Sequence, residues 1–136
     1  VCVGGTFDHL HAGHKLLLSV CAAIAAEAGV EGGQITLGLA SGPLLKEKAF
    51  KEYIQPFSIR ELKVRRLMSL LEPSLQISIS PLEDPFGPSI TIANLTTLVV
   101  SRESEKGGKL VNEERLKCGL KEVDIRVVDL VGSSNN

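Results

Sequence analysis

VCVGGTFDHLHAGH, the sequence of residues 1–14, combines an apolar start, a glycine pair and all three histidines of the chain. The apolar start predicts a β-strand over residues 1–3, Gly4 and Gly5 indicate a turn, and a helix is expected to begin at Gly13. Such a turn presents free backbone N–H groups and the positive end of a helix dipole, which together attract an anion. Imidazoles and a hydroxyl in the same place suit chemistry on a phosphate.

Length and composition exclude several classes of protein. The chain has 136 residues, which fits one domain with a hydrophobic core, and a formal net charge of −1, which argues against a nucleic-acid binder or a membrane-surface protein. Cys2, Cys21 and Cys118 are far apart and odd in number, so a reducing, cytoplasmic compartment is expected. No segment is apolar over the ~20 residues that a bilayer requires. Because the chain begins on a strand without Met, we expect a fragment of a longer polypeptide.

Short β-rich runs alternate with helical stretches, which predicts an α/β fold with a Rossmann-like open sheet of five parallel strands and helices on both faces. Strands are expected at residues 1–3, 34–40, 75–79, 97–101 and 123–131. Helices are expected from residue 13 to a C-cap at Gly29, from a capping box of Ser58 and Glu61 to Pro73, and over residues 112–118 before Gly119. A polar loop is expected over residues 41–55, a single domain over 1–131 and a disordered polar tail over 132–136.

Polar clusters follow the first four predicted strands. Because ligands of open α/β sheets bind beyond the carboxyl ends of the strands, these clusters are expected to meet at one edge. They are Thr6, His11 and His14 after the first strand, Lys46, Lys48 and Lys51 after the second, Glu83 and Asp84 after the third, and Ser101, Arg102 and Glu103 after the fourth.

Each cluster also has a simpler interpretation. The histidines could form a transition-metal site, but no cysteine or second histidine cluster supplies the further ligands that zinc requires. The lysines could form a solvated face, and the glycine pair a plain turn, since it lacks the G-x-G-x-x-G dinucleotide pattern. Arg102 and Arg115 could pair with neighbouring glutamates.

Two motifs carry a family resemblance. Gly5-Thr6-Phe7-Asp8 followed by His11-Ala12-Gly13-His14 resembles the G-T-F-D and H-x-G-H signature of the nucleotidylyltransferase superfamily. The segments DPFGP at 84–88, VVSRES at 99–104 and NEER at 112–115 narrow the resemblance to phosphopantetheine adenylyltransferases of the eukaryotic and archaeal type. The likeness covers residues 1–131, nearly the whole chain.

The resemblance implies an activity in coenzyme A biosynthesis. ATP and 4′-phosphopantetheine would give dephospho-coenzyme A and pyrophosphate by in-line displacement without a covalent intermediate, with Mg²⁺ carried by ATP and no dedicated protein ligands. The attacking phosphate is already ionised at neutral pH, so alignment and charge stabilisation suffice and no strong general base is needed. In some eukaryotes this domain is fused to dephospho-coenzyme A kinase, so fusion to that enzyme or association with it is implied. The sequence does not predict the oligomeric state.

The resemblance also implies a role for each matching residue. Thr6 would hold the acceptor phosphate, His14 would bind ATP phosphates and stabilise the transition state, and His11 would contact the nucleotide. Gly5, Phe7 and Gly13 would contact ATP, and Lys46, with Lys48 as the alternative, would bridge the acceptor phosphate and the triphosphate. Arg102 would bind either phosphate, and Arg115 would bind the triphosphate.

The chain also departs from the superfamily pattern. Many members end in an Ile-Ser-Ser-Thr segment that wraps the nucleotide phosphates, and Gly132-Ser133-Ser134 is the only echo of it here. His9 has no assigned role and is expected to be structural. The alternatives are a cytidylyltransferase, a mononucleotide adenylyltransferase, or a silent nucleotide-binding or scaffolding domain. The intact set of Thr6, His11, His14 and Lys46 argues against a silent domain.

Overall fold

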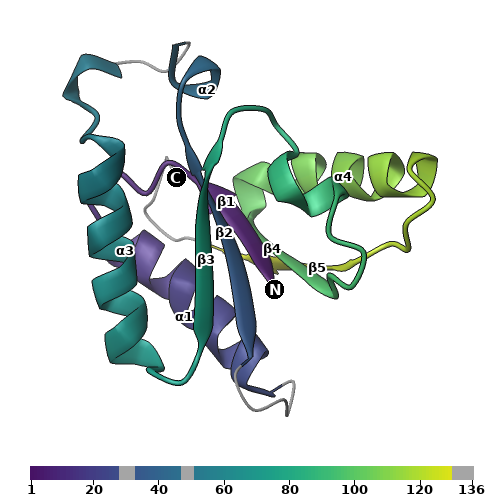
Figure 1. Ribbon diagram of the computed structural model, residues 1–136, viewed down its shortest axis with the longest axis horizontal. Helices are drawn as coiled ribbons and strands as arrows, with labels where there is room; N and C mark the ends of the chain where they lie inside the picture. The colour runs from purple at the N-terminus through teal and green to yellow at the C-terminus, as the bar shows by residue number, and fades with distance from the viewer. Residues whose placement is uncertain (28–32, 47–50, 130–136) are drawn as a thin grey trace.

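A computed structural model of the chain describes residues 1–27, 33–46 and 51–129. Within these residues, five parallel strands form one sheet in the order β3-β2-β1-β4-β5 (Figure 1). The strands are β1 (Cys2–Gly5), β2 (Gln34–Ala40), β3 (Gln76–Leu82), β4 (Thr97–Ser101) and β5 (Asp124–Val128). The predicted α/β fold with an open parallel sheet is confirmed.

Helices cover both faces of the sheet. In Figure 1, α1 and α3 lie together on one side, and α4 lies on the other with the turn η2. None of the helices in the described part of the chain is long and apolar enough to cross a bilayer. The elements are α1 (Ala12–Glu27), α2 (Pro43–Lys46), α3 (Phe57–Leu71) and α4 (Glu105–Lys117), with 3-10 turns η1 (Lys51–Tyr53), η2 (Gly87–Ile90) and η3 (Arg102–Ser104).

The alternation of side chains along β1 divides the core in two. Val3 belongs to a large cluster with Leu17 of α1 and Met68 of α3, whereas Cys2 belongs to a smaller cluster with Val111 of α4. Successive side chains of a strand point to opposite faces, so one short strand serves both clusters. The sheet is therefore anchored on both sides at the strand that leads into the Gly-Thr-Phe-Asp segment.

The strands predicted at residues 34–40 and 97–101 are confirmed with the same bounds. The first strand begins and ends later than predicted, at Cys2–Gly5, and the third extends to Leu82 instead of ending at residue 79. This extension includes Pro81, which an edge strand tolerates because its missing N–H faces no further strand. The fifth strand is shorter than predicted, and residues 130–131 of that prediction lie outside the described residues.

The prediction of a capping box at Ser58 and Glu61 is wrong. The N-cap of α3 is Pro56, whose side chain makes no capping hydrogen bond, and Ser58 already lies inside the helix. Glu61 instead accepts a hydrogen bond of 3.0 Å from Arg65 on the next turn. The predicted polar loop over residues 41–55 is also wrong in part, because α2 and η1 form within it.

Helix α4 begins at Glu105, not at residue 112 as predicted. Gly107 and Gly108 have low helix propensity, which is why the sequence favoured a loop there. A Cβ on Gly108 would lie 3.3 Å from Cγ2 of Ile125, so this glycine allows α4 to approach β5 closely. The predicted end at Gly119 is confirmed by its φ of +78°. The predicted C-cap Gly29 and the tail over 132–136 lie outside the described residues.

Candidate active site

Thr6 lies directly after β1, at the carboxyl end of the sheet. Its side chain is buried, and its Oγ1 has no hydrogen-bond partner among the described residues. Leaving a buried hydroxyl unpaired costs about 1–3 kcal/mol, so such atoms in a native fold call for an explanation. A hydroxyl held ready for a bound phosphate supplies one.

His11 and His14 cap the start of α1 reciprocally. The His11 side chain accepts a hydrogen bond at Nδ1 from the backbone N–H of Gly13, at 3.1 Å. The His14 side chain in turn accepts at Nδ1 from the backbone N–H of His11, at 3.4 Å. This is the arrangement of a capping box, with two imidazoles in place of the usual hydroxyl and carboxylate. The spacing of the two histidines therefore serves the local fold at the start of α1.

The His14 side chain is a neutral imidazole at pH 7 and can donate a hydrogen bond. Burial, and secondarily the neighbouring His11, lower the pKa of His14 from 6.5 to about 4, so its ring is neutral at pH 7. A neutral imidazole that accepts at Nδ1 carries its proton on Nε2. That Nε2 is buried and has no partner among the described residues. The ring stacks on His11 with centroids 3.8 Å apart and contacts Phe7 at 5.4 Å, which fixes its orientation.

The turn between Thr6 and α1 has an unusual backbone. Phe7 and His9 have φ values of +50° and +47°, in the left-handed region that costs a non-glycine residue about 1–2 kcal/mol. The Asp8 carboxylate stabilises the turn by pairing with His9 Nδ1 at 2.9 Å and accepting from the backbone N–H of Gln55 at 2.8 Å. His9, which sequence reasoning left without a ligand role, thus takes part in the turn. Strained backbone of this kind is concentrated at functional sites.

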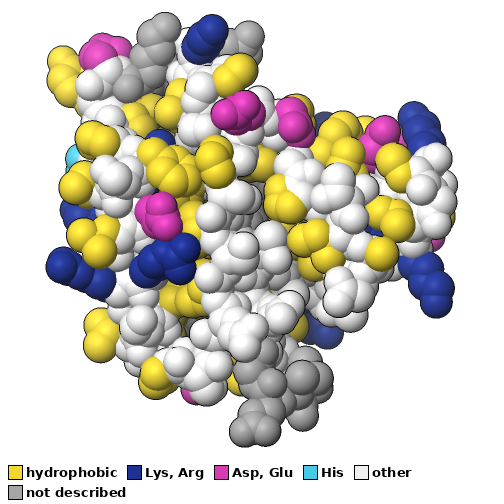
Figure 2. All heavy atoms as spheres, in the orientation of Figure 1, with side chains coloured by type: hydrophobic (Ala, Val, Ile, Leu, Met, Phe, Trp, Pro, Cys, Tyr) yellow, Lys and Arg dark blue, Asp and Glu magenta, His cyan; other side chains and the backbone are white. Residues whose placement is uncertain are grey.

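A cavity of about 620 Å³ lies beside this turn, between the sheet and the elements η2 and α4. Apolar and polar residues both line it, including Thr6, Ser89, Ser101 and Ser104, and Glu103 is the carboxylate that lines it among the described residues. On the face seen in Figure 2, most Lys and Arg side chains lie towards the edges, some lie beside an acidic side chain over α3, and uncharged groups occupy the middle. A cavity of this size and mixed lining suits a small-molecule ligand that has both apolar and polar groups.

The structure brings the predicted residues of the first motif together but places the predicted cations further out. Gly5 and Thr6 line the cavity, and Phe7, His11, Gly13 and His14 are connected to them through the turn and the capping pair. Lys46 is exposed on α2, whose Leu44 lines the cavity. Arg102 is 61% exposed and lies 3.6 Å from both Glu105 and Asp129. The rival Lys48 lies outside the described residues.

Arg115 has a different place from the one predicted. It is fully buried, and it donates hydrogen bonds to the backbone carbonyls of Lys121, Ser89 and Ile92 at 2.7, 2.8 and 2.9 Å. These bonds tie η2 and its neighbouring segment to α4. Arg115 therefore holds the cavity wall through its Nε and Nη1, whereas its Nη2 is buried without a hydrogen-bond partner among the described residues. Its role as a triphosphate ligand stays a prediction.

Sequence reasoning missed a second buried arginine, Arg60 of α3, which is 2% exposed and bonds to the backbone at the start of the site. The sequence surrounds it with helix residues, and nothing in that pattern separates it from a surface arginine. The described residues contain no group of three or more His, Cys, Asp or Glu side chains arranged to hold a metal ion.

We compared the chain with known proteins by sequence and by fold. No family model matches the chain. A phosphopantetheine adenylyltransferase of Pyrobaculum aerophilum is 34% identical over 132 residues, which cover 96% of this chain and 79% of that protein. The chain belongs to the phosphopantetheine adenylyltransferase family. A protein of the same name from Saccharomyces cerevisiae is 37% identical over 130 residues, or 96% of this chain.

The fold agrees as well. A crystal structure of an Archaeoglobus fulgidus protein of unknown function matches this chain with a TM-score of 0.79 at 27% sequence identity, and the match covers 99% of this chain and 93% of that one.

Membership of the phosphopantetheine adenylyltransferase family confirms the resemblance drawn from the two motifs and the three narrowing segments. The chain spans about two fifths of the length of the yeast relatives it matches, 41% of the Saccharomyces cerevisiae protein and 39% of an uncharacterised Schizosaccharomyces pombe protein. Relatives in this family are adenylyltransferases by name.

Proposed function

We propose that this chain transfers the adenylyl group of ATP to 4′-phosphopantetheine, giving dephospho-coenzyme A and pyrophosphate. One observation carries the proposal: two buried donors, Thr6 Oγ1 and His14 Nε2, stand without partners among the described residues at the end of β1. They adjoin the N-terminus of α1, where backbone N–H groups and the helix dipole favour an anion. Family membership then specifies which anions are meant.

The proposed reaction needs no proton transfer by the protein. An oxygen of the acceptor phosphate attacks the α-phosphorus of ATP, the new P–O bond forms, and the bond to the bridging oxygen breaks so that pyrophosphate leaves with the electron pair. The neutral Nε2–H of His14 would donate to the negative charge on the α-phosphate, and Thr6 would hold the acceptor phosphate in line. The cavity beside Thr6, lined by both apolar and hydroxyl-bearing residues, would take the pantetheine arm, which itself carries methyl, hydroxyl and amide groups.

Lys46, Arg102 and Mg²⁺ complete the proposal. Lys46 is the last residue of α2, the short helix that follows the carboxyl end of β2. From this position its ammonium group would bridge the acceptor phosphate and the triphosphate. Arg102 would have to exchange its two acidic neighbours, each 3.6 Å away, for a phosphate. Glu103 supplies one carboxylate at the cavity among the described residues, and hard cations such as Mg²⁺ prefer phosphate oxygens and water, so the ion would enter with ATP. A cytoplasmic location and fusion to, or association with, dephospho-coenzyme A kinase remain part of the proposal.

The direct test is the variant His14→Ala, assayed for pyrophosphate release with ATP, Mg²⁺ and 4′-phosphopantetheine. Losing one transition-state donor lowers turnover by on the order of a hundredfold. Ser19→Ala, on the more exposed side of the same helix, is the matched control and should keep normal turnover. Normal turnover of a folded His14→Ala protein would contradict the assigned role, and a wild type that binds ATP without turnover would favour the silent-domain alternative.

A further inference from the structure

Arg60 ties together three segments that meet at the candidate site. Its Nη1 donates to the backbone carbonyl of Thr6 at 3.0 Å and to that of Ala40 at 2.8 Å, and its Nε donates to the carbonyl of Gln55 at 2.8 Å. Thr6 follows β1, Ala40 ends β2, and Gln55 precedes α3, so one side chain links the carboxyl ends of two adjacent strands to the base of a helix. The guanidinium is 2% exposed and remains charged, because arginine is not deprotonated in proteins.

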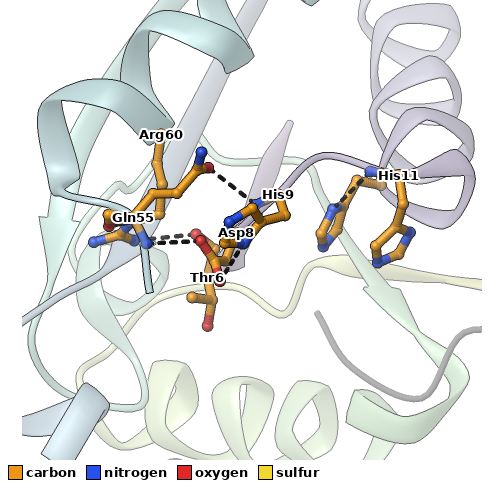
Figure 3. Close-up of polar contacts among 7 residues, drawn as sticks. Thr6, Asp8, His9, His11, Gln55 and Arg60 are labelled. Carbon is orange, nitrogen blue, oxygen red and sulfur yellow. Dashed lines mark hydrogen bonds and ion pairs between the residues drawn. The ribbon is translucent and has the colours of Figure 1, made fainter. Parts of the chain in front are cut away.

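Gln55 and Asp8 form a second link between the same segments. The Asp8 carboxylate accepts from the backbone N–H of Gln55 at 2.8 Å, and the Gln55 side chain accepts at Oε1 from the backbone N–H of His9 at 3.1 Å. Figure 3 shows Gln55 and Arg60 side by side, facing the turn that carries Thr6, Asp8 and His9. We call Arg60, Gln55 and Asp8 the clasp.

The clasp holds a turn that would not keep its shape unaided. Phe7 and His9 lie in the left-handed region of φ, which side chains rarely adopt, so hydrogen bonds from outside the turn must keep them there. The bonds of the clasp reach the residue before Phe7, the residue between Phe7 and His9, and His9 itself. The direction of the Thr6 hydroxyl and the start of α1 are thereby set from α3.

We propose that Arg60 is a positioning residue for adenylyl transfer, an inference that rests on the proposed function. Through Thr6 and Ala40 it fixes the end of β1, which carries the phosphate-binding donors, against the end of β2, which leads into α2 with Leu44 and Lys46. The attacking phosphate and the α-phosphate must be closely aligned for the reaction, because a misplacement of ~1 Å can lower the rate of the catalysed step by about a hundredfold. Arg60 does not line the cavity and acts through the backbone carbonyls to which it donates.

The test compares Arg60→Lys with Arg65→Lys. Arg65 lies on the same helix but is 44% exposed and pairs with Glu61, so its lysine variant should behave as wild type. Arg60→Lys keeps the positive charge but cannot donate to all three backbone carbonyls in the same geometry. We expect kcat to fall about tenfold or more, and the KM values for ATP and 4′-phosphopantetheine to change by less than about threefold. Turnover is expressed per ATP-binding site counted by calorimetry, because a merely structural role would reduce the number of sites and leave kcat per site unchanged.

Gln55→Ala keeps the inference testable if Arg60→Lys does not fold. It removes the acceptor for the His9 N–H from a half-buried side chain, and kcat per site should fall severalfold with unchanged ATP stoichiometry. Normal kcat per site in a folded Arg60→Lys protein overturns the positioning role of Arg60. Where that variant does not fold, normal kcat per site in Gln55→Ala overturns the positioning role of the clasp to which Arg60 belongs. A wild type that releases no pyrophosphate from ATP and 4′-phosphopantetheine overturns the proposed function instead, so the two failures are separate.

Discussion

Thr6→Val should make the protein more stable and less active. The buried Oγ1 of Thr6 has no partner among the described residues, so valine of nearly the same shape removes a penalty of about 1 kcal/mol, at the low end of the cost of an unpaired hydroxyl. For 136 residues, an unfolding entropy of about 2.1 cal/mol/K per residue gives roughly 0.3 kcal/mol/K in total, and hence a rise in Tm of about 3–4 °C. The same change removes a proposed phosphate ligand and should lower turnover by on the order of tenfold to a hundredfold.

Thermal unfolding by circular dichroism and pyrophosphate release, measured on the same preparations, check this prediction. Thr6→Ser is the control, since it retains the hydroxyl and should retain most of the turnover while losing a buried methyl group. A Thr6→Val protein with a lower Tm than wild type would refute the reasoning, because it would mean that the hydroxyl is satisfied in the folded protein without a ligand.

Three other predictions concern the same region. Folded His14 is neutral down to pH about 4, whereas its unfolded form binds a proton below about 6.5, so the unfolded state holds more protons between these values. The contribution of His14 to the free energy of unfolding should therefore be level above pH 6.5 and fall by on the order of 3 kcal/mol towards pH 4. Urea titrations at several pH values test this, and His14→Gln should remove that part of the slope. Lys46→Ala should raise the KM for 4′-phosphopantetheine more than it weakens ATP binding measured by calorimetry; the reverse order would assign Lys46 to the nucleotide. Gly87→Ala should lower stability by about 1–2 kcal/mol in urea titrations, because its φ of +53° disfavours a side chain and a Cβ would collide with Leu82; an unchanged midpoint would contradict this.

The fold was predictable where apolar runs are long and turns are marked. The strands at 34–40 and 97–101 are short, predominantly apolar segments followed by polar residues, and their bounds agree with the structure. Helix α4 was placed too late because Gly107 and Gly108 resemble a loop locally, while the requirement for a small residue at Gly108 comes from Ile125 of β5, far along the chain. Local propensity carries no information about such a contact.

The candidate site was predictable only in part, for a similar reason. The Gly-Thr-Phe-Asp and His-x-Gly-His motifs are contiguous, so their proximity follows from the sequence. Arg60 is separated by 54 residues from Thr6 and by 20 from Ala40, and its acceptors are backbone carbonyls that every residue possesses. Arg115 was assigned to the triphosphate through the family resemblance, whereas its burial against backbone carbonyls depends on tertiary packing that the sequence does not reveal.

The central claim is that this chain joins ATP to 4′-phosphopantetheine. The most direct measurement is pyrophosphate release by the purified chain with ATP or CTP and Mg²⁺, each with and without 4′-phosphopantetheine. We predict release that requires both ATP and 4′-phosphopantetheine. Release with CTP in place of ATP, or release with ATP that is independent of 4′-phosphopantetheine, would contradict the account.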